Sequence, residues 1–134
     1  MRDNIKTPLA IFSAEREGLT ERQNAERTDE LRAYLKGQGI PYNEAQGCWD
    51  GTEETSFIIH GRELSEGLER LLFSVYEQEA VLTTDINGAA FLHYARAGKR
   101  EPIGNFTEVP SSVGLDAYTR YGSRYYTVIP FNEE

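Results

Sequence analysis

The sequence has 134 residues, of which 39% are hydrophobic, and carries 22 acidic against 14 basic side chains for a net charge of -8. This length and composition predict a single α+β domain over residues 1–134 with one core. The negative charge is spread along the chain, which argues against binding to duplex DNA or RNA, because affinity for phosphates needs concentrated positive charge. The same charge favours solubility or a basic partner.

The single cysteine, Cys48, excludes an internal disulfide and favours a reducing compartment. We expect no signal peptide, and the longest apolar runs are too short to cross a bilayer. The sequence therefore predicts a cytoplasmic protein without a membrane partner.

Residues 8–14 open the chain with an uninterrupted apolar run, which predicts a strand that is covered on both faces or central in a sheet. A helix over residues 20–36 follows. Thr20 and Gln23 have the spacing of a capping box at its start, and the glycines after residue 36 mark its end.

The stretch 54–86 is predicted to form a strand-helix-strand core. A short strand over 42–47 precedes it, and the core itself consists of a strand over 55–60, a helix over 65–79 and a strand over 80–86. Apolar residues recur at helical spacing in the helix, so one of its faces should be buried. These residues are Leu64, Leu68, Leu71, Leu72 and Val75.

Asn87 and Gly88 give the strongest hairpin signal in the chain and should join the preceding strand to one over 90–95. Residues 98–134 are expected to form a loop-rich extension, because much of that region is rich in glycine, proline and serine. A last strand over 125–131 should close on a sheet edge.

The first six predicted elements follow the order β-α-β-β-α-β, which is the pattern of a ferredoxin-like fold. We therefore expect a mostly antiparallel sheet with two helices on one face and an added C-terminal hairpin and strand. In this fold the first strand lies between the third and fourth and is antiparallel to both. Its end should gather polar side chains into a candidate ligand-binding rim. The rim residues are Arg16, Arg22, Asn24, Glu54, Ser56 and Gln78.

Arginines near the start of the first helix have the chemistry to recognise a nucleotide or another anion, although a solvated helix face is the more common explanation of such residues. Asp50, Glu53 and Glu54 have the chemistry to hold a divalent cation, but acidic turns are usually only solvated. Known catalytic and phosphate-binding motifs are missing from the sequence. The sequence therefore predicts no catalytic residues, no metal and no cofactor, and leans away from an enzyme.

A second candidate site is a C-terminal segment in which tyrosines alternate with arginines. This composition is typical of protein interfaces, and it also suits stacking on single-stranded nucleic acid or a tyrosine-rich edge of the core. We therefore favour a role of this segment in binding a protein partner or in forming a homodimer. The residues are Tyr118, Arg120, Tyr121, Arg124 and Tyr125.

Short matches over the first two thirds of the chain resemble an uncharacterised family of bacterial and phage proteins, domain of unknown function 3293. The resemblance implies a compact α+β domain and brings no established activity. The matching residues are Ser13, Ala14, Asn24, Leu31, Leu35, Gly47, Glu54, Ser56, Phe57 and residues 78–82.

Two functions from different classes follow. The first is a small acidic binding protein that acts through protein-protein contacts; the family resemblance permits a phage origin and a host or defence component as its target. The alternative is a nucleotide- or anion-binding sensor or small enzyme that uses the rim.

Overall fold

The computed structural model describes residues 8–49, 51–61, 64–78, 80–94 and 100–131, with the side chain of residue 49 left out. In chain order the elements are β1 (Leu9–Phe12), α1 (Glu21–Gly37), β2 (Asn43–Trp49), β3 (Thr52–His60), α2 (Glu66–Arg70), the π-helix η1 (Leu71–Val75), β4 (Ala80–Thr84), β5 (Ala89–Tyr94), β6 (Arg100–Val109), β7 (Ala117–Tyr121) and β8 (Arg124–Ile129).

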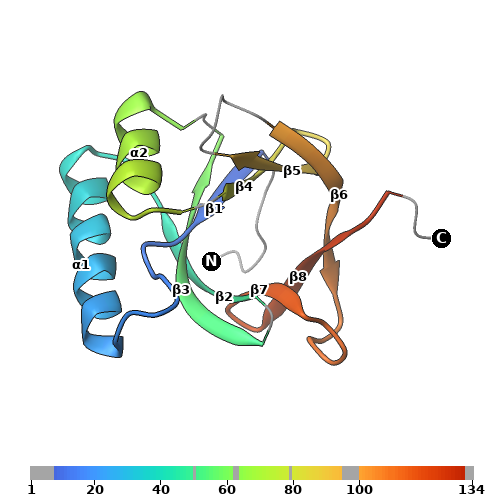
Figure 1. Cartoon of the computed structure of the whole chain (residues 1–134). Helices are drawn as coiled ribbons and strands as arrows, with labels where there is room; N and C mark the ends of the chain where they lie inside the picture. The colour runs from blue at the N-terminus through green and yellow to red at the C-terminus, as the bar shows by residue number, and fades with distance from the viewer. Residues whose placement is uncertain (1–7, 50, 62–63, 79, 95–99, 132–134) are drawn as a thin grey trace.

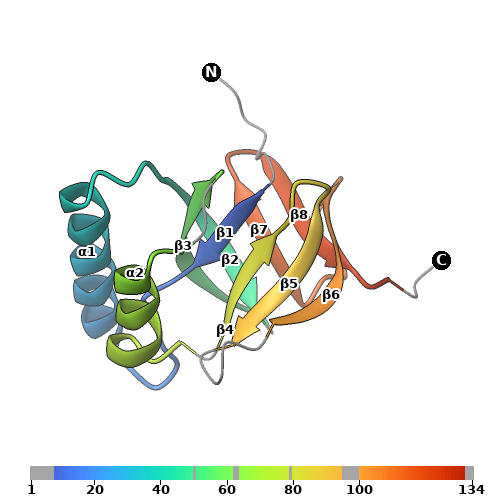
Figure 2. The ribbon, with the colours of Figure 1, turned by 90° about the horizontal axis from the view of Figure 1, so that it is seen from above.

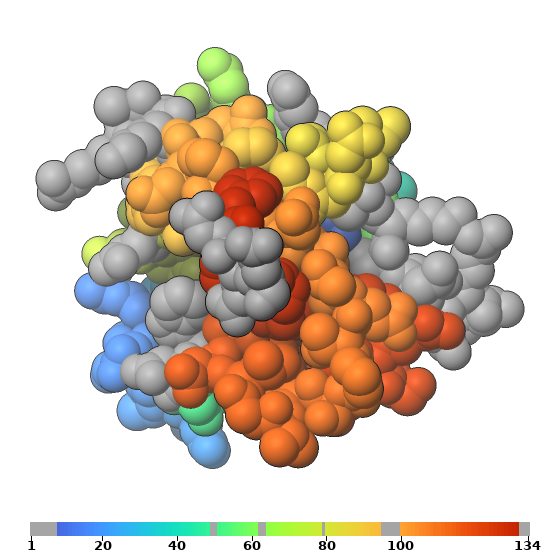
Figure 3. Space-filling model, turned by 90° about the vertical axis from the view of Figure 1, so that its right-hand side faces the viewer, coloured from blue at the N-terminus to red at the C-terminus, as the bar shows by residue number. Residues whose placement is uncertain are grey.

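The strands close into an antiparallel barrel in the order β1-β3-β2-β7-β8-β6-β5-β4 (Figures 1 and 2). Both helices lie outside the barrel on one side of it. The surface on the opposite side is built mainly from the C-terminal strands and the loop between β6 and β7 (Figure 3). Among the residues described, no helix combines the length and apolar character needed to cross a bilayer.

The ferredoxin-like prediction is wrong, because the sheet does not stay open. The predicted place of β1 is nevertheless confirmed, since β1 lies between β3 and β4 and is antiparallel to both. The C-terminal region does not add a hairpin and a strand to an open sheet. It supplies β6, β7 and β8, and the pairing of β7 with β2 closes the barrel. Closure satisfies the backbone groups that a sheet edge would leave unpaired.

The core lies on both faces of β1, whose four residues are all buried, as the uninterrupted apolar run predicts. Ala10 and Phe12 face the helices and pack with the buried leucines of α1, α2 and η1. Leu9 and Ile11 face the other way and pack with Ile58 of β3 inside the barrel. The helices therefore fix β1 from outside, and the barrel interior fixes it from within.

The start of α1 has the predicted capping box. Thr20 Oγ1 accepts a hydrogen bond from the backbone N–H of Gln23 at 3.1 Å, and Gln23 Oε1 accepts one from the N–H of Thr20 at 2.9 Å. These bonds satisfy two amides that a helix start leaves free. They fix the residue at which the helix begins.

The second helix differs from its prediction in its last turn. η1 widens the helix, and the N–H of Tyr76 donates to the carbonyl of Leu71, five residues back, at 2.9 Å. A wider turn changes which residue faces the core. Tyr76 is therefore buried, with 2% of its surface exposed, whereas Val75 of the predicted apolar stripe is 56% exposed.

The hairpin predicted at Asn87 and Gly88 is confirmed, since β4 and β5 pair on either side of it. Asp85 organises this turn, because its Oδ1 accepts from the N–H of Asn87 and of Ala89. Gly88 has a φ of +88°, which a glycine adopts without strain.

Candidate functional site

Glu15 follows the end of β1 and is held against β3. Its own N–H donates to Ser13 Oγ at 3.0 Å, and its Oε2 accepts from the N–H of Thr55 at 2.6 Å. The last pair between β1 and β3 joins Phe12 to Phe57. The carboxylate of Glu15 thus accepts a backbone hydrogen bond from β3 just beyond the point where the pairing of β1 with β3 ends. This hydrogen bond fixes the position of the carboxylate.

Glu54 brings a second carboxyl to the same end of the barrel. Glu54 and Ser56 lie on the face of β3 that also carries Ile58, because side chains alternate along a strand, and Ile58 belongs to the cluster inside the barrel. Opposite Glu54 is Gly47, where a Cβ would lie 2.5 Å from Ser56 Oγ. The missing side chain of Gly47 therefore leaves room for Ser56.

The surroundings of Glu54 make it a weak acid. Burial raises its pKa to about 7, and the nearby negative charge of Glu15 acts in the same direction. Near neutral pH Glu54 is therefore present in both its protonated and its ionised form. A carboxyl whose pKa lies near 7 also has the acidity that suits proton transfer at that pH.

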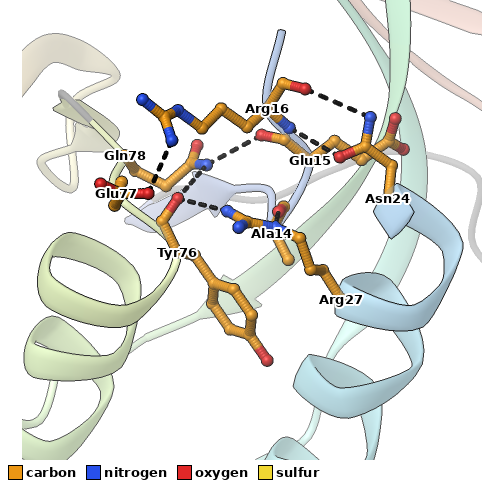
Figure 4. Close-up of polar contacts among 8 residues, drawn as sticks. All are labelled: Ala14, Glu15, Arg16, Asn24, Arg27, Tyr76, Glu77 and Gln78. Atoms are coloured by element: carbon orange, nitrogen blue, oxygen red, sulfur yellow. Dashed lines mark hydrogen bonds and ion pairs between the residues drawn. The ribbon is translucent and has the colours of Figure 1, made fainter. Parts of the chain in front are cut away.

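Hydrogen bonds tie the exit of β1 to the exit of η1 (Figure 4). Arg27 Nε donates to the carbonyl of Ala14 at 2.6 Å, and its Nη2 donates to the carbonyl of Tyr76 at 2.5 Å. Gln78 Nε2 donates to the carbonyl of Glu15 at 2.9 Å. Two side chains thus bridge the segments on either side of the candidate site.

Arg16 extends this network to Asn24 of α1 and to Glu77, which follows η1. Its backbone N–H donates to Asn24 Oδ1 at 2.9 Å, and Asn24 Nδ2 donates back to its carbonyl at 3.3 Å. Its guanidinium pairs with Glu77 at 2.7 Å. Glu77 has a φ of +56° and is the only non-glycine residue of the described chain with a positive φ.

The charges of this region suit a cation better than an anion. The donors of Arg27 are engaged by carbonyls, and Arg16 is paired with Glu77. Among the residues described, Glu15 and Glu54 bring two carboxyls together beside the end of β1. Anion recognition by arginines, as predicted from the sequence, is therefore not what this arrangement favours.

The predicted rim is brought together in part. Arg16, Asn24 and Gln78 share one network, and Glu54 and Ser56 line the adjoining end of β3. Arg22 instead lies exposed on α1, where it pairs with Glu26 at 3.5 Å. The sequence reasoning missed Glu15; the available signal was an acidic residue directly after the buried end of a strand.

The tyrosine-arginine segment is divided between the two faces of β7 and β8. The rings of Tyr118 and Tyr125 meet edge to face at 5.8 Å. Tyr121 instead packs against the cluster inside the barrel, and Arg124 pairs with Glu108 at 3.0 Å. The segment is therefore not one continuous surface, and Arg120 is half-buried on β7.

No group of three metal-ligating side chains comes together among the residues described. Asp50, one of the acidic residues considered for a cation, lies outside them.

The barrel end thus defines a class of site, an acidic one suited to a positively charged group of a ligand. Residues 10–129 match the sequence model of the S-adenosylmethionine lyase family. The chain belongs to this family, since the match covers most of its length. Comparison with curated proteins gives no match.

This result corrects two predictions. The resemblance to domain of unknown function 3293 is wrong, because the matched family is a different one that is named for an activity. The preferred function, a binding protein that acts through protein contacts, is contradicted for the same reason. The alternative of a small enzyme that uses the rim agrees better with the family.

Proposed function

We propose that this protein is a lyase that breaks a carbon-sulfur bond of S-adenosylmethionine at the end of the barrel beside Glu15 and Glu54. The family match supports the substrate. The observation that carries the location is the pair of carboxyls in a region whose arginines already have partners.

The charge of the substrate fits this pair. The sulfur of S-adenosylmethionine is a sulfonium with a full positive charge, and partial burial of the carboxylates strengthens their attraction for it. Binding of a cation also favours the ionised form of Glu54, so its proton is released when the substrate binds at or below pH 7. The acidic chain, with its net charge of -8, adds long-range attraction.

The bond broken in the reaction needs no acid on the leaving group. Its electron pair goes to sulfur, which becomes a neutral thioether. The carbon is then satisfied without water, either by loss of a neighbouring proton to a base or by attack of the substrate's own carboxylate. Glu54 has a pKa suited to the base of the first route, and the second route needs mainly correct positioning.

The positive charge on sulfur disappears as the bond breaks. A group that held the sulfonium very tightly would therefore stabilise the substrate more than the transition state. We therefore assign the pair mainly to recognition of the substrate.

The test is incubation with S-adenosylmethionine in water enriched in oxygen-18, followed by mass spectrometry during the first turnovers. A lyase yields a neutral thioether and a second fragment without the heavy oxygen. A hydrolase would place solvent oxygen in a product, and an unchanged substrate would exclude the proposed reaction.

Two variants of adjacent residues localise the site. Glu54→Gln should raise KM about tenfold, since the loss of about 1.4 kcal/mol of attraction changes an affinity by that factor. Glu53→Gln is the matched control, because Glu53 is exposed and accepts a hydrogen bond from Tyr118 at 2.7 Å. Equal KM values for the two variants would remove Glu54 from the site.

A further inference from the structure

Arg27 contacts two chain segments that are far apart in sequence. Its Nε and Nη2 donate to the carbonyls of Ala14 and Tyr76, at 2.6 and 2.5 Å (Figure 4). Its guanidinium also lies over the Tyr76 ring, with Cζ 5.1 Å from the ring centre. The side chain is half-buried, so these contacts are partly shielded from water.

The two carbonyls precede the residues of the candidate site. That of Ala14 comes directly before Glu15, whose carboxylate bonds to β3. The carbonyl of Tyr76 lies just after the end of η1, where a helix leaves carbonyls without intrahelical partners. Gln78 follows Tyr76 by two residues. Gln78 Nε2 reaches back to the carbonyl of Glu15 at 2.9 Å, so the two exits are joined twice.

We propose that Arg27 is a positioning residue for the lyase reaction, because its guanidinium fixes the exit of β1, with Glu15, against the exit of η1, with Gln78. This inference rests on the proposed function. Two donors of one rigid guanidinium hold the two carbonyls at a set separation. A lysine ammonium is a single point charge and does not provide this fork.

Attachment of α1 to the barrel does not require Arg27. Leu31 and Leu35 of the same helix are fully buried in the core. Arg32 forms two hydrogen bonds to Glu44 of β2, at 2.7 and 2.9 Å. Within the described part of the chain Arg27 makes no ion pair, and its polar contacts are with neutral carbonyls. Its contribution is therefore to geometry rather than to charge balance.

The test compares Arg27→Ala and Arg27→Lys with Arg32→Ala. Arg32 is the matched control, because it lies on the same helix and also ties it to the barrel, but at β2. Turnover is measured well below the melting temperature of each variant, so that all are folded. Arg27→Ala should lower kcat on the order of 100-fold, the effect expected of a displacement of about 1 Å among reacting groups. Arg32→Ala should leave kcat unchanged.

Arg27→Lys separates position from charge. It should recover part of the melting temperature, because it keeps a cation near the Tyr76 ring, and it should not recover kcat. Wild-type kcat in Arg27→Lys would overturn the proposal, as would equal losses of kcat in Arg27→Ala and Arg32→Ala.

A second readout does not depend on turnover. The amide proton of Thr55 donates to the Glu15 carboxylate at 2.6 Å, so its chemical shift in an NMR spectrum reports the position of Glu15. It should move in Arg27→Ala and stay in place in Arg32→Ala. An unmoved Thr55 signal in Arg27→Ala would overturn the positioning role, whereas a wild-type protein without lyase activity would overturn only the proposed function.

Discussion

Replacing Glu54 by glutamine should change how the stability of the protein depends on pH. Burial, followed by the charge of Glu15, raises the pKa of Glu54 from its ordinary 4.5 to about 7. The native state therefore keeps a proton that the unfolded chain has already lost between these two pH values. Stability must fall as the pH rises through this window, because the native state binds more protons than the unfolded state.

The size of this fall follows from the two pKa values. Each unit of difference corresponds to about 1.4 kcal/mol, so Glu54 destabilises the fold by up to about 3.5 kcal/mol above pH 7. Water around a half-buried group screens part of this free energy, which makes the figure an upper value. Glutamine has nearly the same shape and does not ionise, so Glu54→Gln should lack the penalty.

Urea unfolding of both proteins between pH 4 and pH 8 measures the effect. The free energies of unfolding should be similar near pH 4 and should diverge toward pH 8, with Glu54→Gln the more stable. Glu53→Gln is the control for the removal of a neighbouring carboxyl at an exposed position. A difference between wild type and Glu54→Gln that stays constant with pH would refute the raised pKa and the environment that we infer for this carboxyl.

Three other comparisons test the fold. Leu72→Ala should lower the free energy of unfolding by about 2 to 5 kcal/mol in chemical denaturation, because Leu72 is fully buried. Val75→Ala should change it by less than about 0.5 kcal/mol. Equal costs for the two variants would contradict the π-helical turn. Gly104→Ala should destabilise strongly or prevent folding, because a Cβ there would lie 2.1 Å from the carbonyl oxygen of Ile129 at a φ of +151°, and a melting temperature like that of wild type would exclude this close approach of β6 to β8. Glu77→Gly should be more stable than Glu77→Ala by about 1 kcal/mol, since only glycine relieves the positive φ, and the reverse order in thermal unfolding would contradict that backbone conformation.

Local features of the sequence predict the local structure well. The capping box at Thr20 and Gln23 and the turn at Asn87 and Gly88 are set by neighbouring residues, and both occur in the structure. The closure of the barrel depends instead on pairing between β2 and β7. Such pairing is made by hydrogen bonds between backbone groups, so it leaves no periodic pattern of apolar residues in the sequence of either strand alone. The first six elements are largely correct, but β6 and β7 lie in the stretch that was expected to be loop-rich, and without them the sheet stays open.

The candidate site shows the same division. Glu54, Ser56 and Gln78 follow from the neighbours of β1, which the order of the elements indicates. Glu15 could not be recognised as their partner, because its bond to Thr55 depends on where the pairing of β1 with β3 stops. Arg27 resembles any surface arginine of a helix until the ends of β1 and η1 are placed beside it.

Closure of the barrel also sets the order in which the protein can fold during translation. When the ribosome has released β1 to β5, these strands can form only an open sheet with β2 and β5 at its edges. The strand that pairs with the other edge of β2 is β7, which is much later in the chain. Cys48 of β2, for example, pairs with Tyr118 of β7, 70 positions further on. At about 5 to 20 residues per second, the missing strands take several seconds to be synthesised. Throughout that interval the edges of β2 and β5 are open to pairing with other chains, so the nascent protein should depend on chaperones most just before its last strands emerge.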